Sequence, residues 1–283
     1  MARRLDKVIM AHSMCAECGQ IIEAPPCGTS LHLLTVFVIV ELRISQPMVN
    51  LRLFNNRLFR TTNLVSFFSS AGFLAVLFVG PLFLQEARHV DALQSGLTTF
   101  PEAIGVVIST QFVARLYPRT GPRMLTALGL TAVSIIMACL CFMGLTTDLW
   151  VMRGLMFLMG FGMAYAFLPM QTAAFATISR AATGQASTLY NAERQLGAAF
   201  GVAILSTVLS AVGITSRSAN GTILPNVTAY HAAFIAAAIL TLIGAGFALV
   251  IHNSDAAATM KTPSKPGETV PEVSINDLSL STD

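Results

Sequence analysis

The chain has 283 residues, of which 54% are hydrophobic and 11% are charged, and its formal net charge is +3 at pH 7. Its mean hydropathy of +0.68 is too high for a water-soluble domain, which needs a charged surface, so the composition indicates a membrane protein. The basic residues stand in a few short segments between apolar runs and not along one basic surface, which argues against a nucleic-acid partner.

The first segment, residues 1–30, is irregular and contains three cysteines. Cys15 and Cys18 form one CxxC pair, and Cys27 follows without a second pair. A structural zinc site needs a full set of ligands at regular spacing. We therefore expect reduced, unpaired cysteines here, and neither a metal site nor a cofactor in the chain.

Residues 31–60 begin with LHLLTVFVIVEL, whose apolar core of about ten residues is too short to cross a membrane. We interpret this segment as a helix remnant followed by a cytoplasmic link. Beyond it, apolar stretches of about 20 residues are each long enough to cross a hydrocarbon core of about 30 Å as a helix. Six such spans are predicted, near 63–85, 95–116, 123–145, 149–173, 187–212 and 229–251.

These spans are predicted to be helices, since barrel strands would alternate apolar and polar residues and the spans do not. The predicted fold class is an all-α membrane protein with a six-helix transmembrane bundle over 61–252. The last segment, 253–283, is polar and contains Pro, Ser and Thr, so we expect a disordered tail.

The Lys and Arg residues of the links between spans are divided unequally between the two sides of the membrane, and the richer side is expected to be cytoplasmic. One side has Arg43, Arg52, Arg57, Arg60, Arg115, Arg119, Arg123, Arg180, Lys261 and Lys265; the other has Arg88, Arg153 and Arg217. This distribution predicts that both termini and the turn at 114–123 lie in the cytoplasm. Pro118, Gly121 and Pro122 are expected to end one helix there before the next begins.

Four blocks stand in order along the chain: QPMVNLRLFNNRLFRTTNLVSFF (46–68), ARLYPRTGPR (114–123), GFGMAYAFLPMQTAAFA (160–176) and GQASTLYNAERQLGAAFGVAILSTVL (184–209). Together they resemble the C-terminal half of a major facilitator superfamily transporter, in the drug:proton antiporter branch with fourteen spans (EmrB/QacA type). The resemblance covers about residues 31–260.

The resemblance implies a fold and a function. The fold would be one half of a major facilitator protein, a 3+3 inverted repeat that meets a second half at a cavity near the membrane midplane. The function would be proton-coupled efflux of drugs or other lipophilic or cationic small molecules, in the plasma (inner) membrane, once an N-terminal half completes the chain. The partners would be the lipid bilayer, a complementary half or a second copy, and the transported molecule.

Two alternatives remain open at this stage. The chain could be a membrane interaction module that assembles but transports nothing, or an inactive, truncated gene product. An enzyme is not expected, because no metal-binding HExxH pair and no phosphate-binding loop is present.

The turn at 114–123 resembles the family pattern G-x-L-x-D-R-x-G-x-R. It matches at Leu116, Arg119, Gly121 and Arg123 and departs from the pattern at Ala114 and Pro118. The resemblance implies that this turn holds neighbouring helices in one transport state. The alternative is that its arginines only anchor the topology.

Glu102 is the strongest candidate for a transport residue, because a charge within a span costs about 2.5–3.5 kcal/mol on insertion scales. A helix that started at Pro101 would be too short to cross the membrane, so we expect the helix to begin near Ser95 and to hold Glu102 one to two turns inside. Glu102 could then bind a proton or a cationic substrate. The alternative is an interfacial glutamate with access to water.

Glu193 and Arg194 are weaker candidates for the proton or substrate pathway. Residues 196–214 can nearly span alone, which would leave both at the cytoplasmic interface. The alternative is that Arg194 faces the interior. Gln111 and Gln171 are polar candidates for the cavity wall.

Small residues and a proline suggest where helices pack closely or bend. Gly197 and Gly201 form a small-xxx-small pair, which is typical of close helix packing. Gly160, Gly162 and Pro169 are expected to loosen or kink the fourth span.

Overall fold

The structure is a computed structural model of the chain, and it describes residues 51–179, 182–217, 223–256 and 259. The described residues, apart from Leu51, belong to the compact unit Arg52–Asp283. The expectations for 1–30, for 31–50 and for most of the tail after 253 lie outside these residues.

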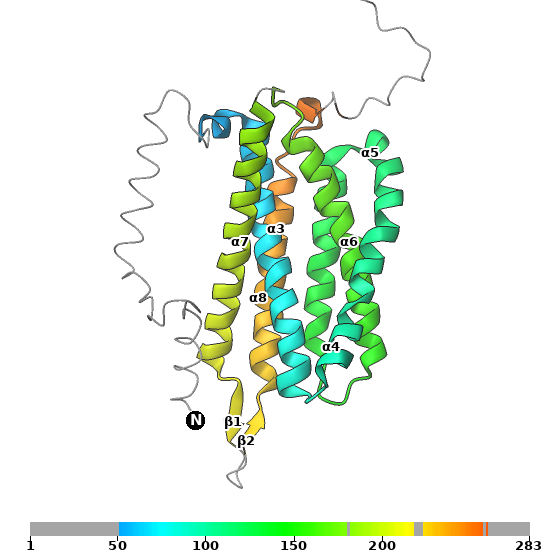
Figure 1. The fold of residues 1–283 in the computed structure, drawn as a ribbon, viewed down its shortest axis with the longest axis vertical. Helices are drawn as coiled ribbons and strands as arrows, with labels where there is room; N and C mark the ends of the chain where they lie inside the picture. Colours follow the sequence, from blue (N-terminus) through cyan, green and yellow to red (C-terminus); the bar gives the residue numbers. More distant parts are fainter. Residues whose placement is uncertain (1–50, 180–181, 218–222, 257–258, 260–283) are drawn as a thin grey trace, which may run out of the picture. The chain divides into compact units, whose positions relative to one another are not determined.

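Helices dominate the described part of the chain and lie side by side in a bundle (Figure 1). The long helices are α3 (Arg57–Leu82), which a π-helical turn extends to Ala87, α5 (Pro101–Cys139), α6 (Leu149–Ala174), α7 (Thr183–Val212) and α8 (Val227–Ala248). A short helix, α4 (Ala92–Thr99), precedes α5, and 3-10 turns occupy Leu51–Asn55, Leu140–Phe142 and Asn253–Ala256.

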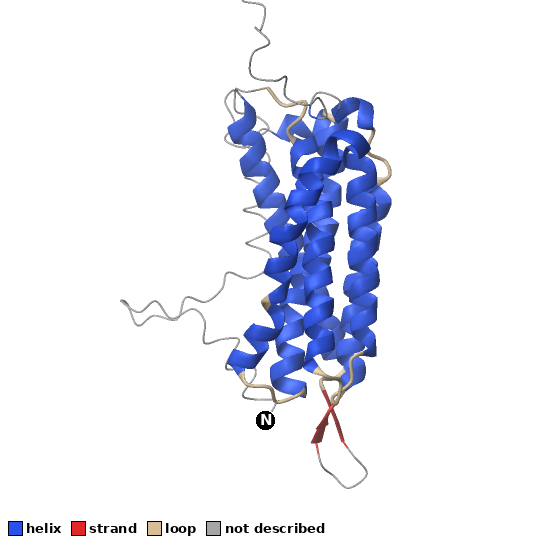
Figure 2. Ribbon diagram, turned by 90° about the vertical axis from the view of Figure 1, so that its right-hand side faces the viewer, coloured by secondary structure: helices blue, strands red, loops and turns tan. Residues whose placement is uncertain are grey.

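Five of these helical stretches are long and apolar enough to cross a membrane: Arg57–Ala87, Ala92–Phe142, Leu149–Ala174, Thr183–Val212 and Val227–Ala248. They confirm the prediction of an all-helical membrane protein at the level of the fold class. The spans expected near 95–116 and 123–145 fall within one stretch, Ala92–Phe142. The fold contains one feature that the sequence did not suggest, a hairpin of β1 (Thr215–Arg217) and β2 (Ile223–Pro225), visible beyond the ends of α7 and α8 (Figure 2).

The chain reverses its direction within α5, at Gly121. Gly121 has φ 76° and ψ 168°, outside the helical region, a conformation that glycine adopts without steric cost. Gly105 contacts Phe161 and Val133 contacts Gly162, although in a straight helix residues 105 and 133 would be about 42 Å apart. The two arms of α5, before and after Gly121, therefore pack side by side against α6.

Of the three residues expected to end the first arm, only Gly121 does so. The helix continues through Pro118 because a proline removes a single hydrogen bond, whereas a positive φ ends the helical path of the backbone. Pro122 then takes the first position of the second arm, where a missing N–H costs nothing.

The start of the second arm is capped by a residue from the other end of the sequence. A helix usually satisfies its first N–H groups with the side chain of its own N-cap residue, and Gly121 has none. Instead, the Arg123 backbone N–H donates to Oδ1 of Asn253 at 3.2 Å. A Cβ atom at position 121 would lie only 2.9 Å from the Asn253 amide. The residues after α8 are thus attached to the turn inside α5.

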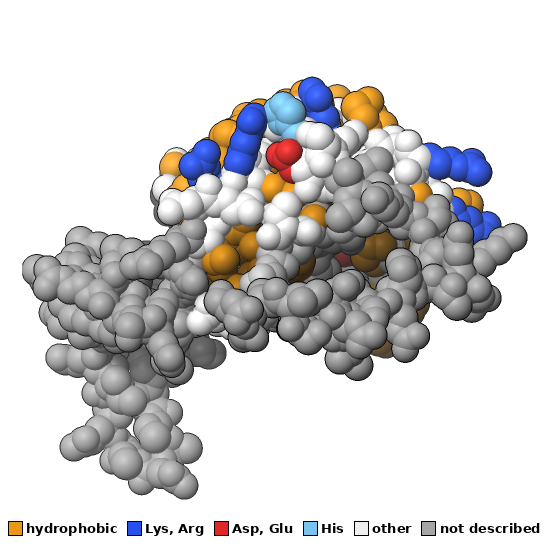
Figure 3. All heavy atoms as spheres, turned by 90° about the horizontal axis from the view of Figure 1, so that it is seen from above, with side chains coloured by type: hydrophobic (Ala, Val, Ile, Leu, Met, Phe, Trp, Pro, Cys, Tyr) orange, Lys and Arg blue, Asp and Glu red, His pale blue; other side chains and the backbone are white. Residues whose placement is uncertain are grey.

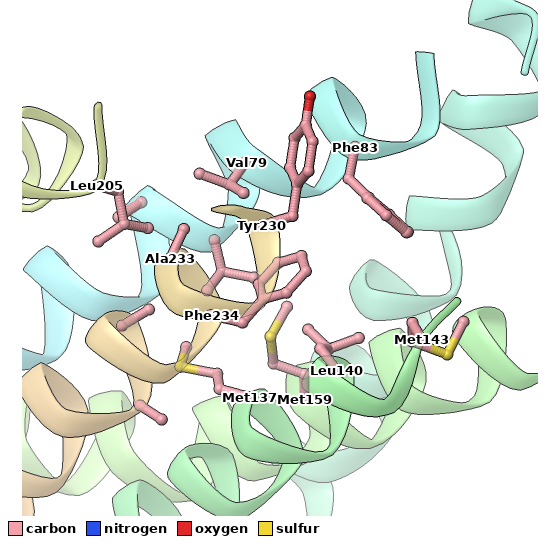
Figure 4. Close-up of a cluster of buried hydrophobic side chains, with 14 of the residues drawn as sticks. Val79, Phe83, Met137, Leu140, Met143, Met159, Leu205, Tyr230, Ala233 and Phe234 are labelled. Carbon is pink, nitrogen blue, oxygen red and sulfur yellow. The ribbon is translucent and has the colours of Figure 1, made fainter. Parts of the chain in front are cut away.

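The centre of the bundle is filled by aromatic and methionine side chains (Figure 4). The ring of Phe83 packs edge-on against Tyr230 at 5.3 Å and against Phe234 at 6.2 Å, measured between ring centroids. Met137 and Met159, from α5 and α6, are fully buried beside them. Flexible methionines fill the irregular gaps between crossing helices, so this cluster joins α3, α5, α6 and α8.

We expect Gly121→Ala to destabilise the protein by more than Gly213→Ala. Both glycines have a positive φ, which costs an alanine about 1–2 kcal/mol, but only at 121 would the new Cβ also meet the Asn253 side chain. The measurement is the thermal unfolding midpoint of the purified chain in detergent. Asn253→Ala should lower the midpoint through the lost cap, and the double variant Gly121→Ala/Asn253→Ala should lose less than the two single losses combined. Equal effects at 121 and 213 would contradict the contact with Asn253.

Candidate functional site

A cavity of about 560 Å³ lies between α3, α5, α6 and α7. Most of its wall is apolar and includes Phe73, Met163 and Phe167. Its charged groups are Glu102 on α5 and Arg194 on α7. Within the described residues no ion pair joins these two side chains. The cavity therefore offers an apolar wall with one carboxylate and one guanidinium group kept apart.

Glu102 is held in the cavity wall by close packing of α5 against α6. α5 begins at Pro101 with Glu102 in its first turn, and the helix start predicted near Ser95 falls inside α4, which precedes α5 in the apolar stretch Ala92–Phe142. A Cβ atom on Gly160 of α6 would overlap the backbone carbonyl of Glu102, and one on Gly105 would overlap the carbonyl of Phe157. Only glycine permits this approach, which fixes the position of the first arm of α5 on α6.

Arg194 and Glu193 are neighbours in sequence but face different surroundings. Arg194 is exposed and lines the cavity. Both carboxylate oxygens of Glu193 are buried, and the Ser66 hydroxyl of α3 lies beside them without the geometry of a full hydrogen bond. Since adjacent helical residues point about 100° apart, the same turn of α7 supplies one charge to the cavity and one to the contact with α3.

The contact between α3 and α7 depends on the small residues that the sequence singled out. Gly197 lies against the backbone of Phe67, and Gly201 lies against the backbone of Ala71. Both glycines are buried, as is Tyr190 one helical turn before Glu193. We refer to this contact between α3 and α7 as the α3–α7 seam.

The other predicted site residues lie outside the cavity wall. Gln111 and Gln171 are exposed, so a role in transport remains a prediction for both. Leu116, Arg119 and Arg123 are exposed around the Gly121 turn. Gly162 contacts the second arm of α5 at Val133, and Pro169 is buried within an α6 that stays helical from Leu149 to Ala174.

Comparison with known proteins identifies the family of the chain. Residues 37–202, more than half of the sequence, match the Major Facilitator Superfamily. The chain belongs to this family of membrane transporters and is an integral membrane protein. Membership also supports the prediction that it is not an enzyme.

Three similar proteins are transporters or carry resistance names. Multidrug resistance protein Stp of Mycobacterium tuberculosis is 30% identical over 205 residues, which are 68% of this chain and 37% of Stp. The uncharacterized MFS-type transporter YcnB of Bacillus subtilis is 29% identical over 243 residues, 84% of this chain and 48% of YcnB. The multidrug resistance protein B homolog of M. tuberculosis is 26% identical over 189 residues, 65% of this chain and 35% of that protein. The chain therefore spans less than half the length of each.

We expect Gly160→Ala and Gly201→Ala to destabilise the bundle, because the added methyl would overlap backbone atoms of α5 and α3 respectively. Overpacking of this kind costs about 1–3 kcal/mol. Gly154→Ala is the matched control, since a Cβ there meets no atom within 4 Å. The readout is again the thermal midpoint in detergent. A Gly154→Ala loss as large as the other two would show that helix propensity, and not close packing, sets the effect.

Proposed function

We propose that the chain is the C-terminal half of a fourteen-span drug:proton antiporter of the EmrB/QacA type, and that it crosses the membrane six times. The crossings are α3, the first arm of α5 with α4, the second arm of α5, α6, α7 and α8. The support for separate crossings is the reversal at Gly121, since one straight helix from Ala92 to Phe142 would be about 75 Å long.

The packing of the helices supports a 3+3 inverted repeat. The first helix of each triplet packs against the second helix of the other: α3 against α7 through Gly201, and α6 against the first arm of α5 through Gly160. The third helices meet each other, and the Ser134 hydroxyl of α5 donates to the Ala238 carbonyl of α8 at 2.8 Å. Two triplets with matching contacts are what a repeat predicts.

The cavity is the observation that carries the proposed activity. About 560 Å³ is within the range of small-molecule sites, and an apolar wall with a single carboxylate suits a lipophilic cation. In this proposal Glu102 binds the substrate cation or a proton, and Arg194 limits how many positive charges the cavity holds. Gln111, Gln171 and Glu193 remain candidates for the rest of the pathway.

A second half is part of the proposal. Alternating access requires two bundles that rock about a shared cavity. The matched part covers less than half the length of YcnB and of Stp. Among the five spans, α7 is the least buried, since 22% of its most apolar segment is buried inside the structure. Glu102 and Arg194 would meet lipid unless another bundle covered them, which is costly. The partner is a complementary N-terminal half or, failing that, a second copy.

The proposed orientation places both termini and the Gly121 turn on the cytoplasmic side of the plasma (inner) membrane. Figure 3 looks onto the end of the bundle that holds this turn and shows several Lys and Arg side chains there. Such an excess is typical of the cytoplasmic side.

We expect an impermeant thiol reagent outside intact cells to modify a cysteine introduced at Asp91 or Thr146, but not one at Thr120 or Ser179. Asp91 precedes α4 and Thr146 precedes α6, at helix ends opposite the Gly121 turn, whereas Thr120 precedes Gly121 and Ser179 lies between α6 and α7. The native cysteines are first replaced by serine. Permeabilised cells provide the control, because all four positions should then react. Labelling of Thr120→Cys but not Asp91→Cys in intact cells would reverse the orientation.

We expect the chain alone to export no fluorescent lipophilic cation from a strain that lacks its own pumps. Co-expression with an N-terminal half, taken from YcnB, should produce efflux that an uncoupler abolishes. Glu102→Gln should reduce this efflux by about tenfold or more, as expected for a group that carries a proton. The control is Glu86→Gln, an exposed carboxylate outside the cavity. Efflux by the chain alone would contradict the need for a partner, and assembly with the half without any efflux would favour the interaction-module alternative.

A further inference from the structure

The α3–α7 seam contains buried polar side chains, of which Ser70 also lines the cavity. On α3 these are Asn63, which is 1% exposed, and Ser66 and Ser70, which are fully buried. On α7 they are Tyr190 and Glu193. Buried polar atoms in proteins nearly always have hydrogen-bond partners, so each exception requires an explanation.

From the register of the two helices we infer that Glu193 lies beside Asn63. Gly197 lies opposite Phe67 and Gly201 opposite Ala71, so the helices run parallel in equal steps of four residues. One helical turn before Gly197 and Phe67, the same register pairs Glu193 with Asn63. The Ser66 hydroxyl lies beside both the Glu193 carboxylate and the Tyr190 hydroxyl, which agrees with this arrangement.

Several oxygens of the seam have no hydrogen-bond partner in the described part of the chain. The Asn63 amide nitrogen donates to the Phe59 carbonyl at 2.7 Å, and Oδ1 of the same amide has no partner. Both oxygens of Glu193 and the hydroxyl oxygens of Ser66 and Ser70 also lack partners among the described residues. Each hydroxyl can donate one hydrogen bond, whereas the carboxylate and the amide oxygen can only accept. The hydroxyls of Ser66, Ser70 and Tyr190 are available as donors, yet within the described residues no hydrogen bond of full geometry reaches the Glu193 carboxylate.

Arg194, the next residue of α7, acts on Glu193 electrostatically, but no ion pair joins the two side chains in the described residues. Apart from Glu193, the seam-facing groups of α3 and α7 are hydroxyls and an amide, and the Tyr190 ring packs on Phe175, beyond the end of α6. The nearest charged residues along the two helices, Arg60 and Arg194, are both exposed. A buried carboxylate without a partner is strongly unfavourable, which makes an external cation the simplest way to complete the seam.

We propose that the α3–α7 seam binds a monovalent cation, H⁺ or Na⁺, between Asn63, Ser66 and Glu193. A proton on Glu193 turns one acceptor into a donor toward Oδ1 of Asn63, while the Ser66 hydroxyl donates to the other carboxylate oxygen. Na⁺ would take the carboxylate, amide and hydroxyl oxygens as ligands, the type that hard cations prefer. A divalent ion would leave an uncompensated positive charge in the seam.

The site is distinct from the cavity of Glu102, and its existence does not depend on transport. Its occupancy acts on the contact between α3 and α7, which belong to different triplets of the bundle. The bound cation holds the seam closed, and its release leaves a bare carboxylate that favours entry of water. Under the proposed function, which this step assumes, the occupant is the coupling ion.

The test uses the purified full chain in lipid nanodiscs and measures both sources of the cation. Infrared difference spectra across a pH titration report the C=O band of a protonated carboxyl group. Thermal midpoints across a Na⁺ titration, with K⁺ at equal ionic strength as control, report sodium binding. In Glu102→Gln, which removes the cavity carboxyl from the spectra, we expect one of the two signals, and its complete loss once Glu193→Gln is added. Asn63→Leu in the same background should shift the infrared band or weaken the Na⁺ response.

Glu193→Gln should fold, because a neutral amide supplies the missing donors. A Glu102→Gln background that shows neither signal, or a signal that persists after Glu193→Gln is added, would overturn the proposal. Should the added substitution prevent folding, loss of the signal with Ser66→Ala and Asn63→Leu supports the proposal, and an unchanged signal overturns it. The efflux assay separates this result from the proposed function. A cation signal without efflux in the co-expressed halves rejects transport alone, and efflux without a cation signal rejects the seam site alone.

Discussion

Close contact between helix backbones is the constraint on which the rest of this structure depends. In a membrane, lipid tails are as apolar as the side chains, so helices associate through tight packing and not through exclusion of water. Gly160 and Gly201 let α6 and α7 touch the backbones of α5 and α3. The first contact positions Glu102 in the cavity wall, and the second encloses Glu193 in the seam. Glu102 therefore owes its surroundings to a glycine of the neighbouring helix α6, and Glu193 to a glycine of its own helix α7.

The two acidic residues illustrate how packing separates chemical roles. Glu102 lines an apolar cavity of about 560 Å³ that also contains Arg194. Glu193 is enclosed by hydroxyl and amide groups within a helix contact. A carboxylate in a cavity can meet a molecule of some size, whereas a carboxylate in a closed seam has room only for an ion. The structure thus separates a carboxylate that faces a cavity from one that lies in a helix contact.

The Gly121 turn connects local backbone chemistry to the ends of the bundle. The turn lacks a capping side chain of its own, and Asn253 provides one from the residues that follow α8. Asn56, before α3, similarly donates from its side-chain amide to the Thr177 hydroxyl beyond α6, at 2.9 Å. Links of this kind join separate helices at one end of the bundle, where basic side chains also gather. Any rocking of the bundle has to keep or break these links.

The sequence by itself determined the membrane environment, the helical class and the family, because each depends on local composition and on short ordered motifs. Apolar length alone located α6, α7 and α8 to within a few residues, and Gly121 marked the turn since only glycine combines a positive φ with close contact. Length also predicted that helical structure precedes Pro101, where α4 lies. Gln111 and Gln171, chosen for polarity alone, are exposed, because the polarity of a residue does not specify which way its helix faces. The cap from Asn253, the enclosure of Glu193 beside Ser66 and the hairpin of β1 and β2 were decided by tertiary structure. Each joins residues whose helices or strands must first be placed in register, and no local periodicity in the sequence encodes that register.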